Sequence, residues 1–213
     1  MAPIILSLEG NIGAGKSTLL AALREAHPEW HFVDEPVEEW LQPDVTGRTL
    51  LQNFYEDKRR WAYTFQNAAL LGRSKGLRDT VMYNADSSVI ITERSIDADK
   101  NIFATMLTED GDLTPLEWTL YKKLYAQVEE STPAITAYIH LDTPVTICYD
   151  RITQRARPGE TIEVNYLDRL DSYHFAWLHG RDATAPVLRY NTYSQPKEQS
   201  TVKDVEAFIE QLL

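Results

Sequence analysis

The chain has 213 residues, of which 43% are hydrophobic and 25% charged, so a mainly disordered or collagen-like chain is excluded. It carries 21 lysines and arginines and 32 aspartates and glutamates, a formal charge of −11 that argues against broad binding to a nucleic acid polymer. The single cysteine, Cys148, excludes an intrachain disulfide, and no apolar run is long enough to cross a membrane. We therefore expect a cytoplasmic protein that binds neither nucleic acid polymers nor membranes.

Apolar runs alternate with helical patterns along the whole chain. In order, these patterns predict a strand at 4–8, a helix at 16–26, a strand at 31–34, a long helix from 49 to about 78, a strand at 88–92, helices at 95–107 and 114–130, a strand at 134–141, helices at 144–155 and 163–180, a strand at 187–190 and a helix at 201–213. Strands that alternate with helices indicate an α/β protein with a parallel sheet covered on both faces. No linker rich in proline, glycine or serine divides the chain, so we expect a single domain over residues 1–213.

The clearest motif is the run at residues 10–17, which fits G-x-x-x-x-G-K-S/T without a mismatch between an expected strand and an expected helix. Glycines let the backbone turn so that its N–H groups point inward and hold phosphate oxygens. Lys16 adds a positive charge at the β- and γ-phosphates, and the Ser17 hydroxyl can bind Mg²⁺. The motif therefore predicts a nucleotide-binding cradle. Its residues are Gly10, Asn11, Ile12, Gly13, Ala14, Gly15, Lys16 and Ser17.

Charged residues follow the second and third expected strands. Ligands of open α/β sheets bind beyond the carboxyl ends of the strands, so we expect these residues beside the cradle. Glu35 is a candidate general base, because a hydroxyl group that attacks a γ-phosphate must lose its proton. Glu93 is a candidate ligand of Mg²⁺, directly or through water, and Arg94 a candidate cation for the transferred phosphoryl group. A solvated loop acid and an ordinary ion pair are the alternatives.

Three arginines, Arg151, Arg155 and Arg157, gather at the end of an expected helix, just before the helix-breaking Pro158 and Gly159. Arg151 and Arg155 are four residues apart and therefore share one helix face. A basic helix end that runs into a flexible loop is typical of a lid over a triphosphate, here at about residues 151–164. The alternative is a solvated basic face.

One face of the long expected helix is not purely apolar. At 100° per residue, the residues of this face lie within about 60° of one another around the helix axis. They are Leu51, Tyr55, Ala62, Gln66, Ala69 and Arg73. Phe54 and Phe65 flank this face, so a planar base could be held by Phe65 and read by the donor and acceptor of the Gln66 amide. Alternatively, Gln66 is a satisfied core amide and Arg73 marks where the helix reaches solvent. Asp99, on the next expected helix, can pair with Arg73 if the two helices face each other.

Together these motifs resemble the deoxynucleoside kinase family, over residues 4 to about 178. The family includes deoxycytidine, deoxyguanosine and mitochondrial-type thymidine kinases and a broad-range insect enzyme. The resemblance is carried by residues 8–18, which add Thr18 to the cradle, by Glu35, Pro36 and Val37 with Trp40, by Arg60 and Trp61, by Phe65 and Gln66, by Glu93, Arg94 and Ser95, by Ile102 and Phe103, and by Arg151, Ile152, Arg155 and Arg157.

The resemblance implies a P-loop kinase-type α/β fold with an arginine-rich lid, usually dimeric through helices, and hence a homodimer. It implies phosphorylation of the 5′-hydroxyl of deoxynucleosides for nucleotide salvage, with ATP as the phosphate donor and Mg²⁺ as the cofactor. By matching position, Glu35 would be the base, Arg94 would support the hydroxyl and the phosphoryl group, and Ser17 and Glu93 would bind Mg²⁺. Lys16 would complete the catalytic set.

The same match implies how the substrates are held. Gln66 would bond the base edge, Phe65 and Phe103 would sandwich the ring, and Tyr55 and Glu160 would hold the 3′-hydroxyl. Arg155 and Arg157 would be lid arginines, and Arg151 would lie beside the adenine of ATP. The implied nucleoside pocket comprises Glu35, Trp40, Leu51, Phe54, Tyr55, Phe65, Gln66, Ala69, Arg73, Arg94, Asp99, Phe103 and Glu160.

The base preference follows from three positions that resemble the deoxycytidine kinase branch, Ala69, Arg73 and Asp99. A charged Arg–Asp pair can donate to and accept from cytosine or a purine, and it leaves little apolar room for the methyl group of thymine. We therefore expect deoxycytidine and purine deoxynucleosides to be favoured over thymidine.

Two other functions stay open. A nucleoside monophosphate kinase, such as a thymidylate kinase, would need a cationic site for the acceptor phosphate, which Arg73 or a lid arginine could supply. A non-catalytic nucleotide-binding switch would carry D-x-x-G after a strand, together with N-K-x-D. The first pattern occurs at residues 44–47, where no strand precedes it, and the second is absent from the sequence.

Overall fold

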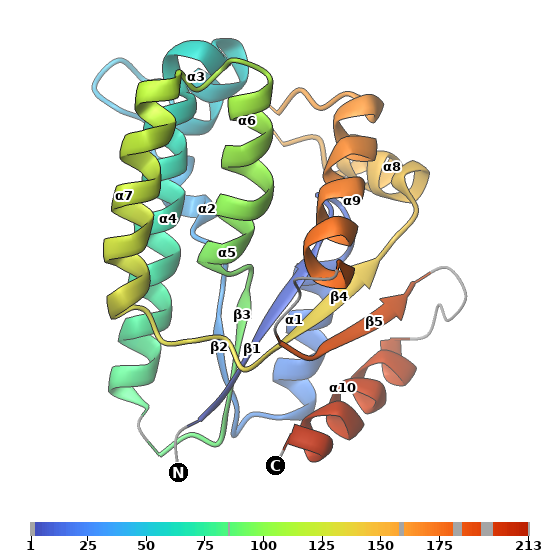
Figure 1. The fold of residues 1–213 in the computed structure, drawn as a ribbon. Helices are drawn as coiled ribbons and strands as arrows, with labels where there is room; N and C mark the ends of the chain where they lie inside the picture. The colour runs from blue at the N-terminus through green and yellow to red at the C-terminus, as the bar shows by residue number, and fades with distance from the viewer. Residues whose placement is uncertain (1–2, 85, 158–159, 181–184, 193–197, 213) are drawn as a thin grey trace.

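Five strands form one parallel sheet at the centre of the molecule (Figure 1). The computed structural model describes residues 3–84, 86–157, 160–180, 185–192 and 198–212. The strands lie in the order β2-β3-β1-β4-β5, and each neighbouring pair is parallel, as the sequence predicts. They are β1 (Ile4–Gly10), β2 (His31–Val33), β3 (Val89–Glu93), β4 (Ala137–Asp142) and β5 (Val187–Asn191).

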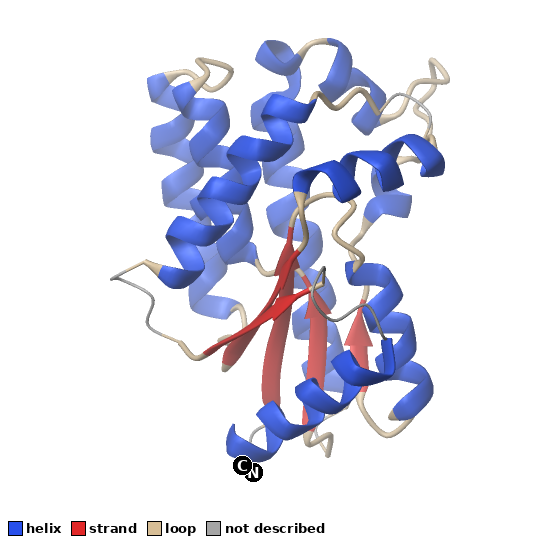
Figure 2. Cartoon of the chain, turned by 90° about the vertical axis from the view of Figure 1, so that its right-hand side faces the viewer, coloured by secondary structure: helices blue, strands red, loops and turns tan. Residues whose placement is uncertain are grey.

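Helices cover both faces of the sheet (Figures 1 and 2). In chain order they are α1 (Lys16–Ala26), α2 (Val37–Trp40), α3 (Leu50–Glu56), α4 (Lys58–Tyr83), α5 (Ile96–Ala98), the π-helix η1 (Asp99–Ala104), α6 (Thr105–Glu109), α7 (Pro115–Ser131), α8 (Val145–Arg155), α9 (Val164–His179) and α10 (Glu198–Leu212). This arrangement confirms the α/β class. No helix within the described ranges is both long enough and apolar enough to cross a membrane.

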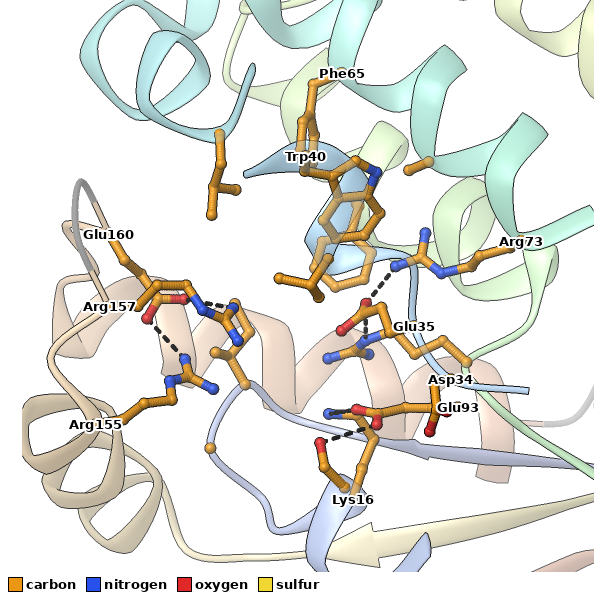
Figure 3. A pocket seen from close by; sticks show the side chains of 18 of the residues that line it. Lys16, Asp34, Glu35, Trp40, Phe65, Arg73, Glu93, Arg155, Arg157 and Glu160 are labelled. Atoms are coloured by element: carbon orange, nitrogen blue, oxygen red, sulfur yellow. Dashed lines mark hydrogen bonds and ion pairs between the residues drawn. The ribbon is translucent and has the colours of Figure 1, made fainter. Parts of the chain in front are cut away.

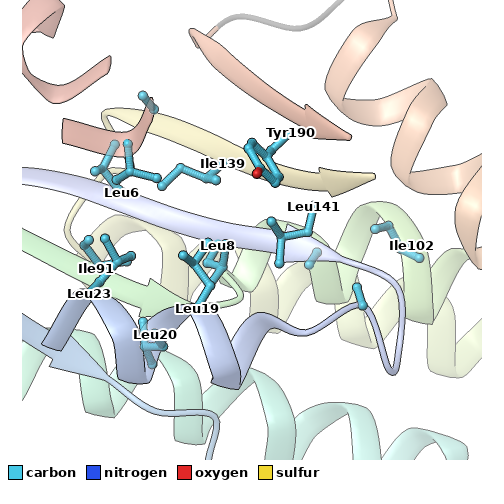
Figure 4. Close-up of a cluster of buried hydrophobic side chains, with 14 of the residues drawn as sticks. Leu6, Leu8, Leu19, Leu20, Leu23, Ile91, Ile102, Ile139, Leu141 and Tyr190 are labelled. Carbon is cyan, nitrogen blue, oxygen red and sulfur yellow. The ribbon is translucent and has the colours of Figure 1, made fainter. Parts of the chain in front are cut away.

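Alternate residues of β1 pack against different helices, because successive side chains of a strand point to opposite faces. Leu6 and Leu8 belong to a cluster that includes leucines of α1 and residues of α10 (Figure 4). Ile5 packs instead with Leu77 of α4. Leu6 and Leu8 are fully buried, and burial of a leucine side chain contributes roughly 1.5–3 kcal/mol. The central strand is therefore packed on both faces, and the loops at the edge of the sheet extend from this core.

The register of the sheet brings three charged segments to one edge. Leu8 of β1 lies beside Glu93, the last residue of β3, and Gly10 ends β1 beside β4. β2 ends at Val33, two residues before Glu35. The cradle, Glu35 and Glu93 thus leave the sheet at its carboxyl edge, where open α/β sheets bind ligands.

The prediction of one long helix from 49 to about 78 is wrong in one respect, because the structure has two helices, α3 and α4, in this range. The backbone leaves the helical region at Asp57, with φ −142° and ψ 79°. The Asp57 side chain accepts a hydrogen bond from the Arg60 N–H, 3.0 Å away, and so caps α4 at its start. A capping box between Thr49 and Gln52 starts α3. The predicted stripe therefore comes from two helices, and α4 runs on to Tyr83.

The helix predicted at 95–107 contains a π-turn. It runs through α5, η1 and α6, from Ile96 to Glu109. The Thr105 hydroxyl donates to the Lys100 carbonyl oxygen five residues earlier, 2.7 Å away, which supports the wider turn. Such π-turns often occur at functional sites.

The structure differs from the sequence analysis at two further places. The strand predicted at 134–141 begins only at Ala137, because the Ile5 N–H donates to the Thr136 side-chain hydroxyl (3.1 Å) instead of a backbone carbonyl. Helix α2 was not predicted, because four residues are too few to show a helical period.

Candidate active site

A cavity of about 580 Å³ lies at the carboxyl edge of the sheet (Figure 3). Its size is typical of a small-molecule site. It brings together all the predicted site residues except Gly10, Asn11 and Ala14, which belong to the cradle backbone without lining the cavity. It adds three residues that were not predicted to be in the site, Asp34, Val37 and Tyr166.

The cradle is held by close backbone contacts. Gly13 has φ +80°, and a side-chain carbon built there would lie 2.5 Å from the backbone oxygen of Cys148 in α8, so only glycine fits. The Asn11 side chain donates to the Leu167 carbonyl oxygen, 2.8 Å away, and ties the loop to α9. Helix α1 begins at Lys16, so its N-terminus faces the loop. This is the geometry in which a helix N-terminus binds phosphate.

Lys16 lies folded along the cradle. Its Nζ donates to the carbonyl oxygens of Asn11 (2.9 Å) and Gly10 (3.2 Å) and lies 4.0 Å from Glu93 Oε1. Burial, with the nearby positive charge of Arg94, lowers the Lys16 pKa to about 8. The amine is therefore a cation at neutral pH whose charge is little screened.

Ser17 and Glu93 place two side-chain oxygens beside the cradle. The Ser17 hydroxyl donates to Glu93 Oε2, 2.9 Å away. Mg²⁺ in phosphate sites takes one or two protein oxygens and completes its shell with water and phosphate. The part of the chain that the structure describes holds no group of three or more His, Cys, Asp or Glu side chains suited to a metal. The two residues thus fit a magnesium ion that is bound mainly through phosphate.

Glu35 lies in a buried network of charges (Figure 3). Arg73 Nη2 is 2.5 Å and Arg94 Nε is 3.3 Å from Glu35 Oε1. Arg73 Nη1 bonds Asp99, which confirms the predicted Arg73–Asp99 contact, whereas the Glu35–Arg73 contact was not predicted. Burial opposes ionisation of Glu35, but the charges of Arg73, Arg94 and Lys16 outweigh it and lower the Glu35 pKa to about 2. Burial holds the pKa of Asp99 above its usual value, against the effect of Arg73.

Arg94 has a strained backbone that is fixed on both sides. Its φ of 65° lies in the left-handed region, which is unusual for a residue other than glycine. The Arg94 N–H donates to the Leu8 carbonyl oxygen (3.2 Å), and its own carbonyl accepts from the Thr92 hydroxyl (3.0 Å). Glu9 Oε1 accepts the N–H of the next residue, Ser95, at 2.9 Å. The guanidinium lies 4.9 Å from the centre of the Phe103 ring.

Aromatic rings form the wall of the cavity farthest from the cradle. Phe54 and Phe65 stack with ring centres 4.5 Å apart, and Trp40 meets Phe65 edge-on at 5.1 Å. Two polar atoms of this region, Gln66 Oε1 and Asp99 Oδ2, are buried and have no hydrogen-bond partner within the described residues. Buried polar atoms without partners are rare and costly, which points to a ligand that completes them.

Two arginines of the predicted lid share one partner, Glu160, and the third contacts the cradle. Arg155 Nη2 lies 2.7 Å and Arg157 Nη1 3.7 Å from the Glu160 carboxylate, on the opposite side of the view in Figure 3 from Glu35. Arg151 Nη1 donates to the Ala14 carbonyl oxygen, 2.9 Å away, and so faces the cradle. Pro158 and Gly159, in the middle of the predicted lid, lie outside the described residues.

Tyr55 and Tyr166 also line the cavity. Burial raises the pKa of both phenols, that of Tyr166 to about 12, so both remain neutral donors. Tyr166 has no motif around it and faces the cavity only because α9 packs behind the cradle. No local pattern in the sequence could have identified it.

A parallel sheet whose central strand leads into a phosphate cradle, with a cavity lined by charged side chains beside it, is the arrangement of a P-loop phosphotransferase. The model of the deoxynucleoside kinase family matches residues 6–211. The chain therefore belongs to the deoxynucleoside kinase family and is a kinase.

Curated relatives agree with this assignment. A probable deoxycytidine kinase of fowlpox virus is 39% identical over 191 residues, which cover 87% of this chain and 77% of that protein. The mitochondrial deoxyguanosine kinase of Xenopus laevis is 33% identical over 236 residues, covering 96% and 89%. The deoxycytidine kinase of Mus musculus is 32% identical over 238 residues, covering 97% and 91%.

Proposed function

We propose that the chain transfers the γ-phosphoryl group of ATP to the 5′-hydroxyl of a deoxynucleoside in a Mg²⁺-dependent reaction. We further propose that deoxycytidine and purine deoxynucleosides are preferred over thymidine. The observation that carries this proposal is the cavity, which the cradle, Glu35, Gln66 and Asp99 line together; Gln66 and Asp99 each have one buried oxygen without a partner among the described residues.

The reaction centre lies between the cradle and Glu35. With its pKa near 2, Glu35 is ionised throughout the physiological range. It orients the 5′-hydroxyl and accepts its proton as the new O–P bond forms, while the bond between the γ-phosphorus and the bridging oxygen breaks and ADP leaves. A strong base is not needed, because phosphoryl transfer passes through a loose transition state. Lys16 and Arg94 stabilise the charge on the phosphoryl oxygens. Ser17 and Glu93 would hold Mg²⁺, which supplies further charge neutralisation at the phosphates.

The base edge supports the proposed preference. Gln66 offers both a donor and an acceptor to a base, and Asp99 offers a free carboxylate oxygen to its exocyclic amino group. Arg73 keeps that carboxylate in place and fills the space that a thymine methyl group would need. The names of the similar deoxycytidine and deoxyguanosine kinases agree with this preference.

The remaining proposed roles are those that the resemblance implies, and all of these residues line the cavity. The base lies between Phe65 and Phe103, and Tyr55 and Glu160 bind the 3′-hydroxyl. On the donor side, Arg155 and Arg157 cover the phosphates, and Arg151 lies beside the adenine. The rest of the proposed nucleoside wall is Trp40, Leu51, Phe54 and Ala69.

Initial rates with ATP and Mg²⁺ test the proposal. The acceptors are deoxycytidine, deoxyadenosine, deoxyguanosine, thymidine and the corresponding monophosphates. Turnover of deoxycytidine and purines with poor thymidine turnover supports both parts, and good thymidine turnover refutes the preference alone. Turnover of monophosphates only would favour a monophosphate kinase, although Arg73, already paired with Glu35 and Asp99, argues against a phosphate site there. ATP binding without any acceptor turnover would favour a switch.

The homodimer and the cytoplasmic location stay predictions. Exposed apolar side chains on adjacent helices, Leu71 of α4 with Leu116 and Leu120 of α7, support a dimer formed through these helices. Light scattering at several protein concentrations measures the oligomeric state, and a monomer at micromolar concentration would refute the dimer.

A further inference from the structure

A buried histidine of α9 contacts the Arg94 guanidinium. His174 of α9 is fully buried, and its Nε2 lies 3.3 Å from Arg94 Nη1. Its other ring nitrogen, Nδ1, lies 2.7 Å from the Leu170 carbonyl oxygen. A carbonyl oxygen can only accept a hydrogen bond, so the imidazole proton is on Nδ1. The lone pair of Nε2 therefore faces the guanidinium and accepts from it.

The two acceptors around Arg94 differ in charge. Arg94 Nε faces the Glu35 carboxylate at 3.3 Å, whereas Nη1 faces a neutral ring. Burial and the positive charge of Arg94 hold the pKa of His174 well below its ordinary value. His140, whose ring lies parallel to that of His174 with centres 6.0 Å apart, is likewise kept neutral by burial, with a pKa of about 4. A neutral acceptor holds the guanidinium in place and leaves its positive charge intact, whereas a second carboxylate would neutralise that charge.

We propose that His174 is a positioning residue for Arg94. Its Nε2 accepts a hydrogen bond from Arg94 Nη1, and this bond directs the guanidinium toward the transferred phosphoryl group. The proposal rests on the proposed function, because it requires Arg94 to act at the reacting phosphate. A misplacement of about 1 Å in such a group can lower the rate about 100-fold. The strained backbone of Arg94 sets where the side chain starts, and Glu35 and His174 set where its tip lies.

Two substitutions separate the two ring nitrogens of His174. His174→Asn keeps a donor for Leu170 but is too short to reach Arg94, whereas His174→Gln can place an amide oxygen near the position of Nε2. We expect His174→Asn to lower kcat for deoxycytidine by about 10- to 100-fold with nearly unchanged deoxycytidine affinity, and His174→Gln to recover most of the rate. His179→Gln changes a histidine that bonds His140 instead, and it should keep the wild-type kcat. A wild-type kcat in His174→Asn would overturn the proposal.

A double-mutant cycle tests whether the effect passes through Arg94. Arg94→Lys removes the Nη1 atom, so His174→Asn should change kcat little in that background. Equal losses in both backgrounds would show that His174 acts only through stability or packing, and would overturn the proposal. Thermal unfolding of each variant provides the folding control.

Nitrogen NMR of the histidine rings in the full chain gives a result independent of turnover. We expect His174 to be the neutral Nδ1–H tautomer at pH 7, with an Nε2 resonance that shifts in Arg94→Lys. An Nε2–H tautomer would overturn the proposal. If the wild-type chain phosphorylates no deoxynucleoside, the proposed function fails, and the NMR result still decides whether the contact with Arg94 exists.

Discussion

Arg73 holds two buried carboxylates, and its removal tests the charge balance of the cavity. Arg73→Met leaves Asp99 without a cation and Glu35 with Arg94 alone, 3.3 Å away. Removing one partner of a buried pair typically destabilises a protein by about 3–5 kcal/mol. For a chain of this size each kcal/mol lowers Tm by about 2–4 °C, so we expect a fall of about 6–20 °C. Adding Asp99→Ala removes the orphaned carboxylate and should restore at least half of that loss.

Thermal unfolding and steady-state kinetics measure the two consequences. Lys75→Met is the matched control, because Lys75 and Asp79 form an exposed pair whose loss should change Tm little. In kinetics, the double variant should raise the ratio of kcat/KM for thymidine over deoxycytidine, since the apolar methionine accommodates the thymine methyl group. A single variant as stable as wild type, or more stable than the double variant, would refute the charge argument. An unchanged ratio would refute the account of the base edge.

The same variant changes the pH dependence. Glu35 is lowered from 4.5 to about 2, so the stability that its ionisation contributes is complete above pH 4.5 and is lost as pH falls toward 2. Without Arg73 the Glu35 pKa rises, and the acid limbs of both stability and kcat/KM should move to higher pH. Identical acid limbs in wild type and Arg73→Met would contradict the assigned cause of the shift.

Three further predictions concern the phosphate side. Lys16→Ala should lower kcat by roughly 10³–10⁵-fold with little change in Tm. Because the Lys16 pKa is about 8, the KM of the wild-type enzyme for ATP should rise as pH passes above that value. Near-wild-type turnover of the variant, or a KM that does not change with pH, would contradict the cradle assignment. Glu35→Gln should lower kcat by about 10²–10⁴ while deoxycytidine still binds, and full turnover would remove its role as base. Ser17→Ala with Glu93→Gln should raise the Mg²⁺ concentration needed for half-maximal rate, and an unchanged titration would rule out this ligand pair.

Features that depend on neighbouring residues were predictable from the sequence. The cradle depends on glycines and on a helix N-terminus a few residues away, so its pattern carries its geometry. The alternation of strands and helices likewise fixed the fold class. The break at Asp57 escaped detection because the hydrophobic period continues across it, and only the backbone angles and the Asp57 cap separate α3 from α4.

Features that depend on distant segments were not predictable in the same way. The contact of Arg73 with Asp99 was predicted on the condition that their helices face each other, because Arg73 stands among apolar residues and a buried arginine needs an acidic partner. The contact of Arg73 with Glu35 was not, since it depends on the direction of the chain after β2. Tyr166 and His174 lie on α9 in an ordinary amphipathic pattern, and only the packing of α9 behind the cradle brings them near the site.

In the proposed function, the Arg73 guanidinium contacts both the proposed general base, Glu35, and Asp99 at the proposed nucleobase edge, so a substitution of Arg73 affects turnover and base recognition together. The order of substitutions then matters. If Asp99 is lost first, Arg73 keeps its contact with Glu35 and no carboxylate is left without a cation. If Arg73 is lost first, the lineage must pass through an unstable intermediate. We therefore expect that descendants that gained activity on thymidine lost Asp99 before Arg73.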